Sequence, residues 1–279
     1  MSNSGKLVLG TVQFGCQYGI NSAGRPDEDM VGQILGCAYD GGIRILDTSS
    51  AYGTSEEVLG RTVPEGSSFR IVSKYPKGAG SVAAMVLNSI ERLRCDGLYG
   101  YLLHHFELFA DNPAIWDDFI AVRENGLAGK IGFSVYTPDE LDRILESGVP
   151  FDIIQLPRNL FDRKFDSYFP ELKARGVEIH VRSTFLQGLF FMDRNALPEK
   201  IRPLRKYLQA LDCFAAETGS DIGRIALNFN LQNPAIDGVL IGVDNVRQMK
   251  DNLENASASC AFPDINVVEQ ELLNPVNWK

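Results

Sequence analysis

Four side chains that can move protons stand at or near the ends of apolar runs. Asp47 ends such a run within RILDTSSAYGTSEEVLG (44–60), and Tyr52 follows five residues later. Lys74 and His104 end two further apolar runs. An ammonium lowers the pKa of a phenol from about 10, and a carboxylate holds that ammonium in place. We therefore predict a site that protonates a carbonyl oxygen while a cofactor delivers hydride, with Tyr52 as the general acid.

Each of the four residues alone also has a more ordinary explanation. A carboxylate at a strand end often caps the next turn, and an isolated lysine is usually solvated. Taken alone, His104 fits a hydrogen-bonded core residue and Tyr52 a residue at a rim. The set favours the catalytic interpretation, because one chemistry uses all four, and a neutral histidine can orient the substrate oxygen.

The elements that must position these residues alternate along the chain. Apolar runs bounded by glycine, proline or polar turns predict eight strands, over Lys6–Thr11, Ile43–Thr48, Arg70–Tyr75, Leu98–Phe106, Lys130–Val135, Asp152–Leu156, Val177–Ser183 and Gly238–Val243. Amphipathic periodicity predicts helices between them, the last over 244–256. Thr54 with Glu57, and Thr137 with Glu140, each fit a capping box at a helix start.

This alternation predicts a single (β/α)8 TIM barrel over residues 1–279. Eight strand–helix units in a chain of 279 residues have about 35 residues each, as such a unit requires. An open doubly wound sheet is the alternative, but its G-x-G-x-x-G fingerprint after the first strand is absent. In a barrel, the active site lies at the carboxyl ends of the strands, where the four residues stand.

The composition of the chain argues against some classes of binding partner. The net charge is −9 without a basic cluster, which argues against nucleic acid and an anionic membrane surface. The sequence has no apolar stretch of about 20 residues and no secretory signal. Its five scattered cysteines lack metal-ligand spacing, so we expect a cytoplasmic protein without a metal. We leave open whether it is a monomer or a small homo-oligomer.

The motifs resemble those of the aldo-keto reductase family, in its bacterial-type, short-loop form. The resemblance rests on Gly10-Thr11, DTSSAYGTSEEVLG, SKYP and LLHHF, and it covers nearly the whole chain. It implies a catalytic tetrad of Asp47, Tyr52, Lys74 and His104. We prefer His104 to His105, because consecutive residues of a strand face opposite sides.

The resemblance also implies a nicotinamide dinucleotide, NADP(H) or NAD(H), bound across the barrel mouth. The matching positions are Gly10, Thr11, Ser134, Gln155, Arg182, Ser183, Gly242, Val243, Asp244, Asn245, Gln248, Asp251 and Asn252. Arg182 occupies the place of an aromatic residue that stacks on the nicotinamide, and a guanidinium can also stack. The family's basic residue for the 2′-phosphate falls at Gln248, which makes NADH a candidate beside NADPH.

The expected substrate is a small carbonyl or sugar-like compound, because the candidate lining mixes aromatic and polar residues, namely Gln13, Phe14, Tyr18, Tyr75, Phe106 and Arg158. Two other functions remain as alternatives. The first is a non-catalytic barrel that senses the cofactor. The second is a Schiff-base aldolase with Lys74 as nucleophile, which requires an uncharged amine that Asp47 opposes. We exclude a metal hydrolase using His104, His105 and Asp47, because consecutive residues of a strand face opposite sides.

Overall fold

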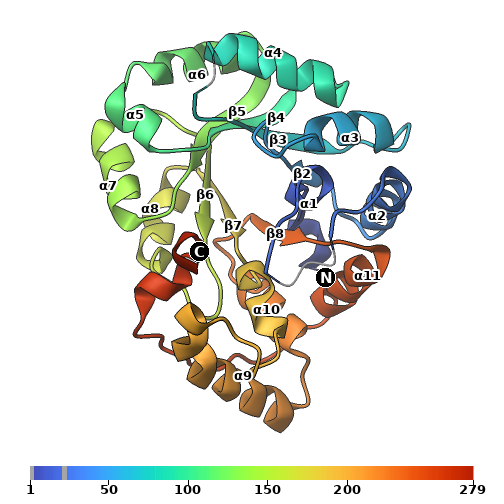
Figure 1. The fold of residues 1–279 in the computed structure, drawn as a ribbon. Helices are drawn as coiled ribbons and strands as arrows, with labels where there is room; N and C mark the ends of the chain where they lie inside the picture. The colour runs from blue at the N-terminus through green and yellow to red at the C-terminus, as the bar shows by residue number, and fades with distance from the viewer. Residues whose placement is uncertain (1–2, 21–23, 79, 279) are drawn as a thin grey trace.

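The strands close into a barrel, in a computed structural model that describes residues 3–20, 24–78 and 80–278. Parallel strands follow one another around it in chain order (Figure 1). They are β1 Leu7–Gly10, β2 Ile45–Asp47, β3 Arg70–Tyr75, β4 Leu98–Leu103, β5 Ala128–Ser134, β6 Ile153–Pro157, β7 Glu178–Arg182 and β8 Gly238–Gly242. Gly10 pairs with Asp47 on one side and with Gly242 on the other, which closes the ring. The predicted (β/α)8 barrel is confirmed.

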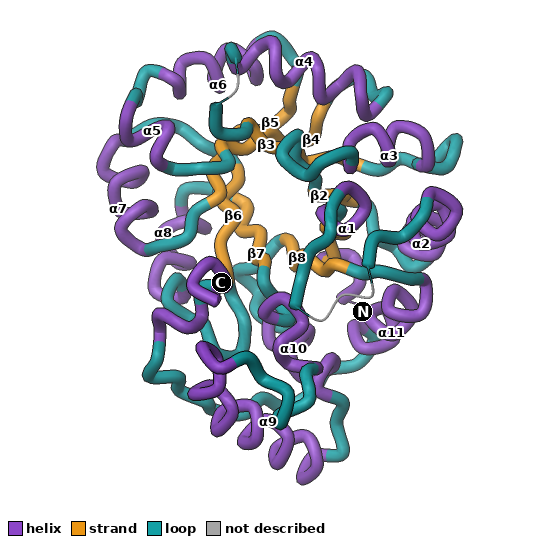
Figure 2. The backbone as a smooth tube through the Cα atoms, in the orientation of Figure 1, coloured by secondary structure: helices purple, strands orange, loops and turns teal. Residues whose placement is uncertain are grey.

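Helices surround the strands (Figure 2). The outer helices are α2 Glu28–Asp40, α3 Ser55–Thr62, α4 Val82–Leu93, α6 Ile115–Glu124, α7 Pro138–Ser147, α8 Phe169–Ala174, α10 Ile222–Leu231 and α11 Val246–Ala256. Short helices α1 Val12–Gly15 and α5 Glu107–Asp111 follow β1 and β4, and α9 Arg205–Thr218 precedes α10. Short 3-10 helices are η1 Asn3–Lys6, η2 Asp166–Tyr168, η3 Leu186–Phe191, η4 Glu199–Leu204, η5 Gln270–Leu273 and η6 Pro275–Trp278. No described helix is long and apolar enough to cross a membrane.

One of the two predicted capping boxes is present. The Thr137 hydroxyl accepts from Glu140 N at 3.3 Å, and the Glu140 carboxylate accepts from Thr137 N at 3.3 Å. The box at Thr54 is wrong, because its side chain makes no cap bond and accepts instead from Arg25 Nη2 at 2.7 Å. The local sequence is compatible with a capping box at both places, but at Thr54 the hydroxyl binds the Arg25 guanidinium instead.

Three apolar clusters hold the fold together. The largest lies between the sheet and its helices, and a small layer inside the barrel includes Val8, Val72 and Leu102. A further cluster joins η3, η4, α9 and α10 to the segment after α11. The expectation of short loops is therefore wrong between β7 and β8, where residues 183–237 carry α9 in addition to α10. Burying apolar side chains of α9, such as Leu208, stabilises this extension.

Candidate active site

The carboxyl ends of β2, β3 and β4 bring the predicted tetrad together. Asp47 is the last residue of β2, and Lys74 is the fifth of the six residues of β3. Tyr52 lies in the turn between β2 and α3. His104 comes directly after β4, which ends at Leu103 and not at Phe106 as predicted. Because parallel neighbouring strands end at the same rim, side chains distant in sequence meet there.

A buried ion pair forms the base of the site. Lys74 Nζ lies 2.6 Å from Asp47 Oδ1 and donates to Thr48 O at 2.8 Å, and the side chains of Lys74 and Asp47 are 0% and 3% exposed. Gln155 Nε2 donates to the other carboxylate oxygen of Asp47 at 2.7 Å. Burial lowers the pKa of Lys74, and the Asp47 charge counteracts it. These bonds hold the ammonium and the carboxylate in fixed places.

Tyr52 lies over this pair. Lys74 Nζ is 5.1 Å from the centroid of its ring, and the ring of His104 meets it edge to face at 5.6 Å. Burial, and then the charge of Asp47, raise the pKa of Tyr52 well above its ordinary value, while Arg182 acts in the opposite direction. The predicted lowering of this pKa is wrong, because desolvation of a phenolate outweighs the nearby cations. Tyr52 therefore holds its proton at neutral pH.

His104 is neutral and oriented. Burial, followed by the charge of Lys74, lowers its pKa to about 2. Its Nδ1 lies 3.2 Å from the Ser49 hydroxyl, which in turn accepts from Ala51 N at 3.1 Å. The Ser49 hydroxyl keeps its own proton and a second acceptor site, so it can donate to Nδ1 or accept from it, and in either case it fixes the orientation of the ring.

The two consecutive histidines do not face opposite sides. The rings of His104 and His105 lie 4.7 Å apart, because β4 ends before them and strand alternation no longer applies. The geometric ground for excluding a metal hydrolase is therefore wrong. The described part of the chain contains no group of three or more His, Cys, Asp or Glu side chains that could hold a metal ion.

A cavity of about 680 Å³ opens beside Tyr52 and extends to α11. Of the predicted site residues, those that line it are Gly10, Thr11, Asp47, Tyr52, Gln155, Arg182, Ser183, Gly242, Asp244, Gln248, Asp251 and Asn252. Five others do not line it, namely Lys74, His104, Ser134, Val243 and Asn245. Ser134 and Val243 are buried, and Asn245 caps α11 by accepting from Gln248 N at 2.9 Å. The prediction of Ser134, Val243 and Asn245 as ligand contacts thus has no support from the cavity lining.

Several lining residues lie outside the predicted set. They include Val12, Thr184, Phe185, Phe191, Asp221, Gly223, Arg224, Glu254 and Asn255. Those from 184 to 224 belong to the β7–β8 connection, whose extra length was not predicted. The start of α10 has a local sequence signal, because aspartate is a preferred N-cap residue. Asp221 caps this helix and accepts from Gly223 N at 2.6 Å.

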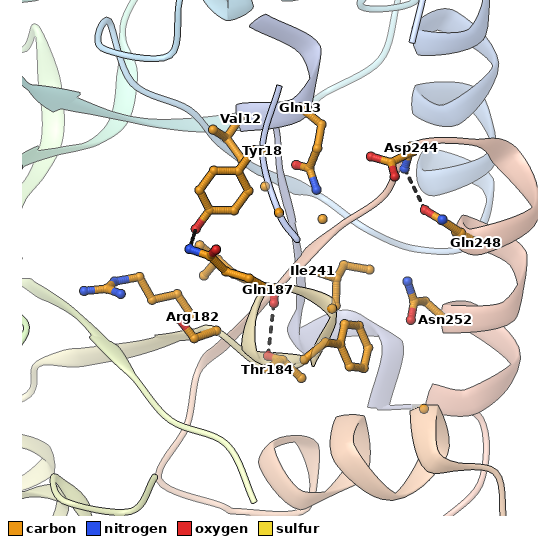
Figure 3. Close-up of a pocket in the computed structure, with 18 of the residues that line it drawn as sticks. Val12, Gln13, Tyr18, Arg182, Thr184, Gln187, Ile241, Asp244, Gln248 and Asn252 are labelled. Carbon is orange, nitrogen blue, oxygen red and sulfur yellow. Dashed lines mark hydrogen bonds between the residues drawn. The ribbon is translucent and has the colours of Figure 1, made fainter. Parts of the chain in front are cut away.

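The two ends of the cavity differ in character (Figure 3). At one end, the Tyr18 hydroxyl accepts from Gln187 Nε2 at 3.1 Å, and at the other, Gln248 Oε1 accepts from Asp244 N at 2.7 Å. The cavity lining near α10 and α11 contains one cation, Arg224, and the carboxylates Asp221, Asp244, Asp251 and Glu254. Asp251 is paired with Arg247 at 4.0 Å, and the lining of this end still has more carboxylates than cations.

A side chain at position 242 would collide with the Gln13 amide. A Cβ atom there would lie 2.4 Å from Nε2 of Gln13, so the Gln13 amide occupies the place of a side chain. The family's frequent lysine at this position does not fit unless Gln13 moves.

Only two of the six candidate substrate-lining residues reach the cavity, Gln13 and Tyr18. Phe14 and Phe106 belong to the hydrophobic core, and the Tyr75 hydroxyl donates to Gly80 O at 2.6 Å. Arg158 is buried against Asp166 and Asn230, with distances of 2.7 and 2.8 Å. Strand and turn patterns locate an apolar residue, but they do not tell which side of the barrel wall it faces.

A parallel barrel with a large cavity at the carboxyl ends of its strands defines a (β/α)8 enzyme architecture. A model of the aldo/keto reductase family matches residues 6–267, and the chain belongs to that family. It is accordingly an NAD(P)H-dependent oxidoreductase.

Relatives and solved structures agree with this membership. The chain is 24% identical to the chloroplastic pyridoxal reductase of Arabidopsis thaliana, over 81% of this chain and 72% of that protein. It is 26% identical to L-galactose dehydrogenase of the same plant, over 91% and 86%. An aldo-keto reductase from Bacillus halodurans, solved in its holo form, has a TM-score of 0.72 at 20% identity, over 98% and 92%. That structural likeness supports the barrel fold.

Proposed function

We propose that the chain reduces the carbonyl group of a small, oxygen-rich compound to an alcohol. Tyr52 donates the proton to the carbonyl oxygen, and His104 Nε2 orients that oxygen by a hydrogen bond. Lys74 and Asp47 supply the fixed charges beneath Tyr52. The observation that carries the proposal is the buried Lys74–Asp47 pair, at 2.6 Å, below a protonated tyrosine and beside a neutral histidine.

The relatives support the oxygen-rich character of the substrate. One is named for pyridoxal and another for L-galactose, and both of these compounds carry several hydroxyl groups. The cavity of this chain presents polar side chains such as Gln13, Tyr18 and Gln187. These can hydrogen-bond hydroxyl groups, so a sugar-like compound suits the cavity better than a purely apolar one.

The cavity also fits an extended dinucleotide. Gly10 and Gly242 are neighbours on β1 and β8 and both line the cavity without a side chain of their own, although the Gln13 amide lies beside Gly242. Such positions let a phosphate approach the main chain closely. When bound, the nicotinamide supplies the hydride. The proposed contacts are Gly10, Thr11, Gln155, Ser183, Gly242, Asp244, Gln248, Asp251 and Asn252.

We infer a preference for NADH over NADPH. The end of the cavity near α10 and α11 contains four carboxylates and the single cation Arg224. A 2′-phosphate placed there meets like charges, whereas a ribose 2′-hydroxyl can donate to a carboxylate. Gln248 stands at the position of the family's basic residue, and its side-chain oxygen accepts a hydrogen bond from Asp244 N.

The geometry disfavours the aldolase alternative. The Lys74 side chain is 0% exposed, and its amine is engaged by Asp47 and by Thr48 O. An amine that attacks a carbonyl must reach the substrate, and here Tyr52 covers it. The intact set of four groups disfavours the sensing alternative, because a barrel without turnover has no use for a buried ion pair beneath Tyr52 and beside His104.

Calorimetric titration with NADH and, separately, with NADPH tests the proposal, followed by turnover of glyceraldehyde. We expect NADH to bind more tightly, and Gln248→Arg to shift the ratio of affinities toward NADPH. A matched Lys250→Gln change on α11 should leave that ratio as it is. Failure of both nucleotides to bind would overturn the proposal, and binding without turnover of any carbonyl would favour the sensing alternative.

A further inference from the structure

Arg182 brings a positive charge to the reactive end of the cavity. It ends β7 and lines the cavity together with Tyr52 and Tyr18. Its Nη2 donates to Val135 O at 3.0 Å, and its guanidinium lies 4.0 Å from the centroid of the Tyr136 ring. Figure 3 shows this side chain on the side of Tyr18 and Gln187, away from Asp244 and Gln248. The backbone bond and the stacked ring hold the cation in one place.

Among the residues that the structure describes, this cation has no carboxylate partner. Within residues 3–20, 24–78 and 80–278, no Asp or Glu oxygen lies within 4.0 Å of Arg182. The carboxylate at this end of the cavity is Asp47, whose two oxygens are bound by Lys74 and Gln155. A charge that is only partly solvated and lacks a partner is a binding element for an anion.

The surroundings of Arg182 are rich in hydrogen-bond donors. Tyr18 accepts from Gln187 and so keeps its own proton to donate, and Tyr52 is protonated. Arg182 also lines a small hollow with Lys164, Ser183 and Asn274, where Lys164 is paired with Asp162 at 2.6 Å. In the cavity, Tyr18 and Tyr52 therefore offer donors beside Arg182, and the Asp47 carboxylate is already bound by Lys74 and Gln155.

Stacking of Arg182 on the nicotinamide is a weaker use of this charge. Tyr136 already covers one face of the guanidinium. Giving up hydride leaves the nicotinamide ring positive, and a cation stacked on it opposes that change by charge repulsion. A fixed cation at this place gains more from an anionic partner.

We propose that Arg182 binds an acidic group, a carboxylate or a phosphate, of the carbonyl substrate. This inference rests on the proposed function and names its substrate class, an acidic carbonyl compound whose carbonyl faces Tyr52 while its acidic group faces Arg182. An arginine binds either oxyanion through paired N–H donors, so the two sources share one chemistry.

Matched substrate pairs test the proposal. One pair is 4-carboxybenzaldehyde and its methyl ester, and the other is glyceraldehyde 3-phosphate and glyceraldehyde. We expect the wild type to favour an acidic member by at least about tenfold in kcat/KM, chiefly through KM. Arg182→Gln should remove that preference, and Arg182→Lys should keep part of it. The control Arg175→Gln removes the same charge from the residue after α8, outside the cavity lining, and should keep the wild-type ratio.

A binding measurement separates this inference from the proposed function. Benzoate and inorganic phosphate are titrated into the wild type, Arg182→Gln and Arg175→Gln by calorimetry, with thermal melting to verify folding. Loss of anion binding in Arg182→Gln alone supports the inference, even if no carbonyl is turned over and the proposed function falls. Equal affinity in wild type and Arg182→Gln overturns it, as do absent binding of both anions and an equal kcat/KM for acidic and neutral substrates.

Discussion

The hydroxyl of Ser49 lies 3.2 Å from Nδ1 of His104 and ties the orientation of the histidine to the turn that carries Tyr52. Ala51 N fixes the hydroxyl from the other side. The turn after β2 thus carries Tyr52, the proposed proton donor, and also orients His104, which we propose aims the substrate oxygen. Ser49 was not among the predicted site residues, because a serine in a turn has no signature of its own.

Replacing Ser49 by alanine should weaken the reaction without unfolding the chain. A lost neutral hydrogen bond of about 1 kcal/mol corresponds to roughly a fivefold fall in kcat/KM. Nitrogen NMR of His104 should then show a mixture of ring tautomers. Ser50→Ala is the control, since that hydroxyl donates to the backbone oxygen of Lys74. An unchanged tautomer in Ser49→Ala would contradict a role of Ser49 in holding the ring proton on Nε2, the form that the proposed function requires.

Tyr52→Phe should abolish carbonyl reduction while cofactor binding persists. The ring keeps its contacts with His104 and Lys74, so the fold has no reason to change. Loss of a general acid costs about 10²–10⁴-fold in rate. Steady-state kinetics measures the loss of carbonyl reduction, and calorimetry with NADH measures cofactor binding. Undiminished turnover would refute the role of Tyr52.

The rate of reduction should show no ionisation near pH 6.5. His104 has a pKa of about 2, so it stays neutral from pH 5 upward, and Tyr52 stays protonated because its pKa is raised. We expect kcat/KM to be flat between about pH 5.5 and pH 9. A histidine-like limb near pH 6.5 in the wild type, absent from His104→Gln, would show that His104 titrates there.

The same histidine should make folding sensitive to acid. Its pKa is about 2 in the folded chain against 6.5 in the unfolded one, so the unfolded state takes up the proton first as the pH falls. Stability is therefore lost below pH 6.5, by about 1.4 kcal/mol per pH unit for one such group. Unfolding by denaturant at several pH values should show a shallower decline for His104→Gln. Parallel curves for the two proteins would count against the burial of a neutral ring.

Breaking the Lys74–Asp47 pair should cost more stability than removing both charges. Lys74→Met leaves a buried carboxylate without its cation, which costs about 3–5 kcal/mol. Adding Asp47→Asn removes the stranded charge and should recover part of the loss, whereas turnover stays absent in both variants. Chemical unfolding measures the difference, and a double variant less stable than Lys74→Met would argue against this coupling.

Much of the fold was predictable because its signals are local. Alternating apolar runs and amphipathic helices predicted all of the strands, and strand boundaries were wrong only by a few residues, as at His104. Backbone hydrogen bonding fixes how often a side chain of a strand or a helix returns to the same face, so the apolar residues of such a segment repeat with that period. The added helix α9 was missed, since its apolar face packs on α10 and on the distant segment after α11.

The residue types and spacing in the sequence determined the order of the strands and placed Asp47, Tyr52, Lys74 and His104 at one rim, from which the kind of chemistry was predicted. Only the tertiary structure decided how those groups behave. Burial raises the pKa of Tyr52 and keeps His104 neutral, and both effects depend on neighbours from other strands. The exposure of Arg182 to the cavity and the burial of Arg158 were equally undecided by sequence. Solvation and charge act through space, so they are determined when the barrel closes and not by the order of residues along the chain.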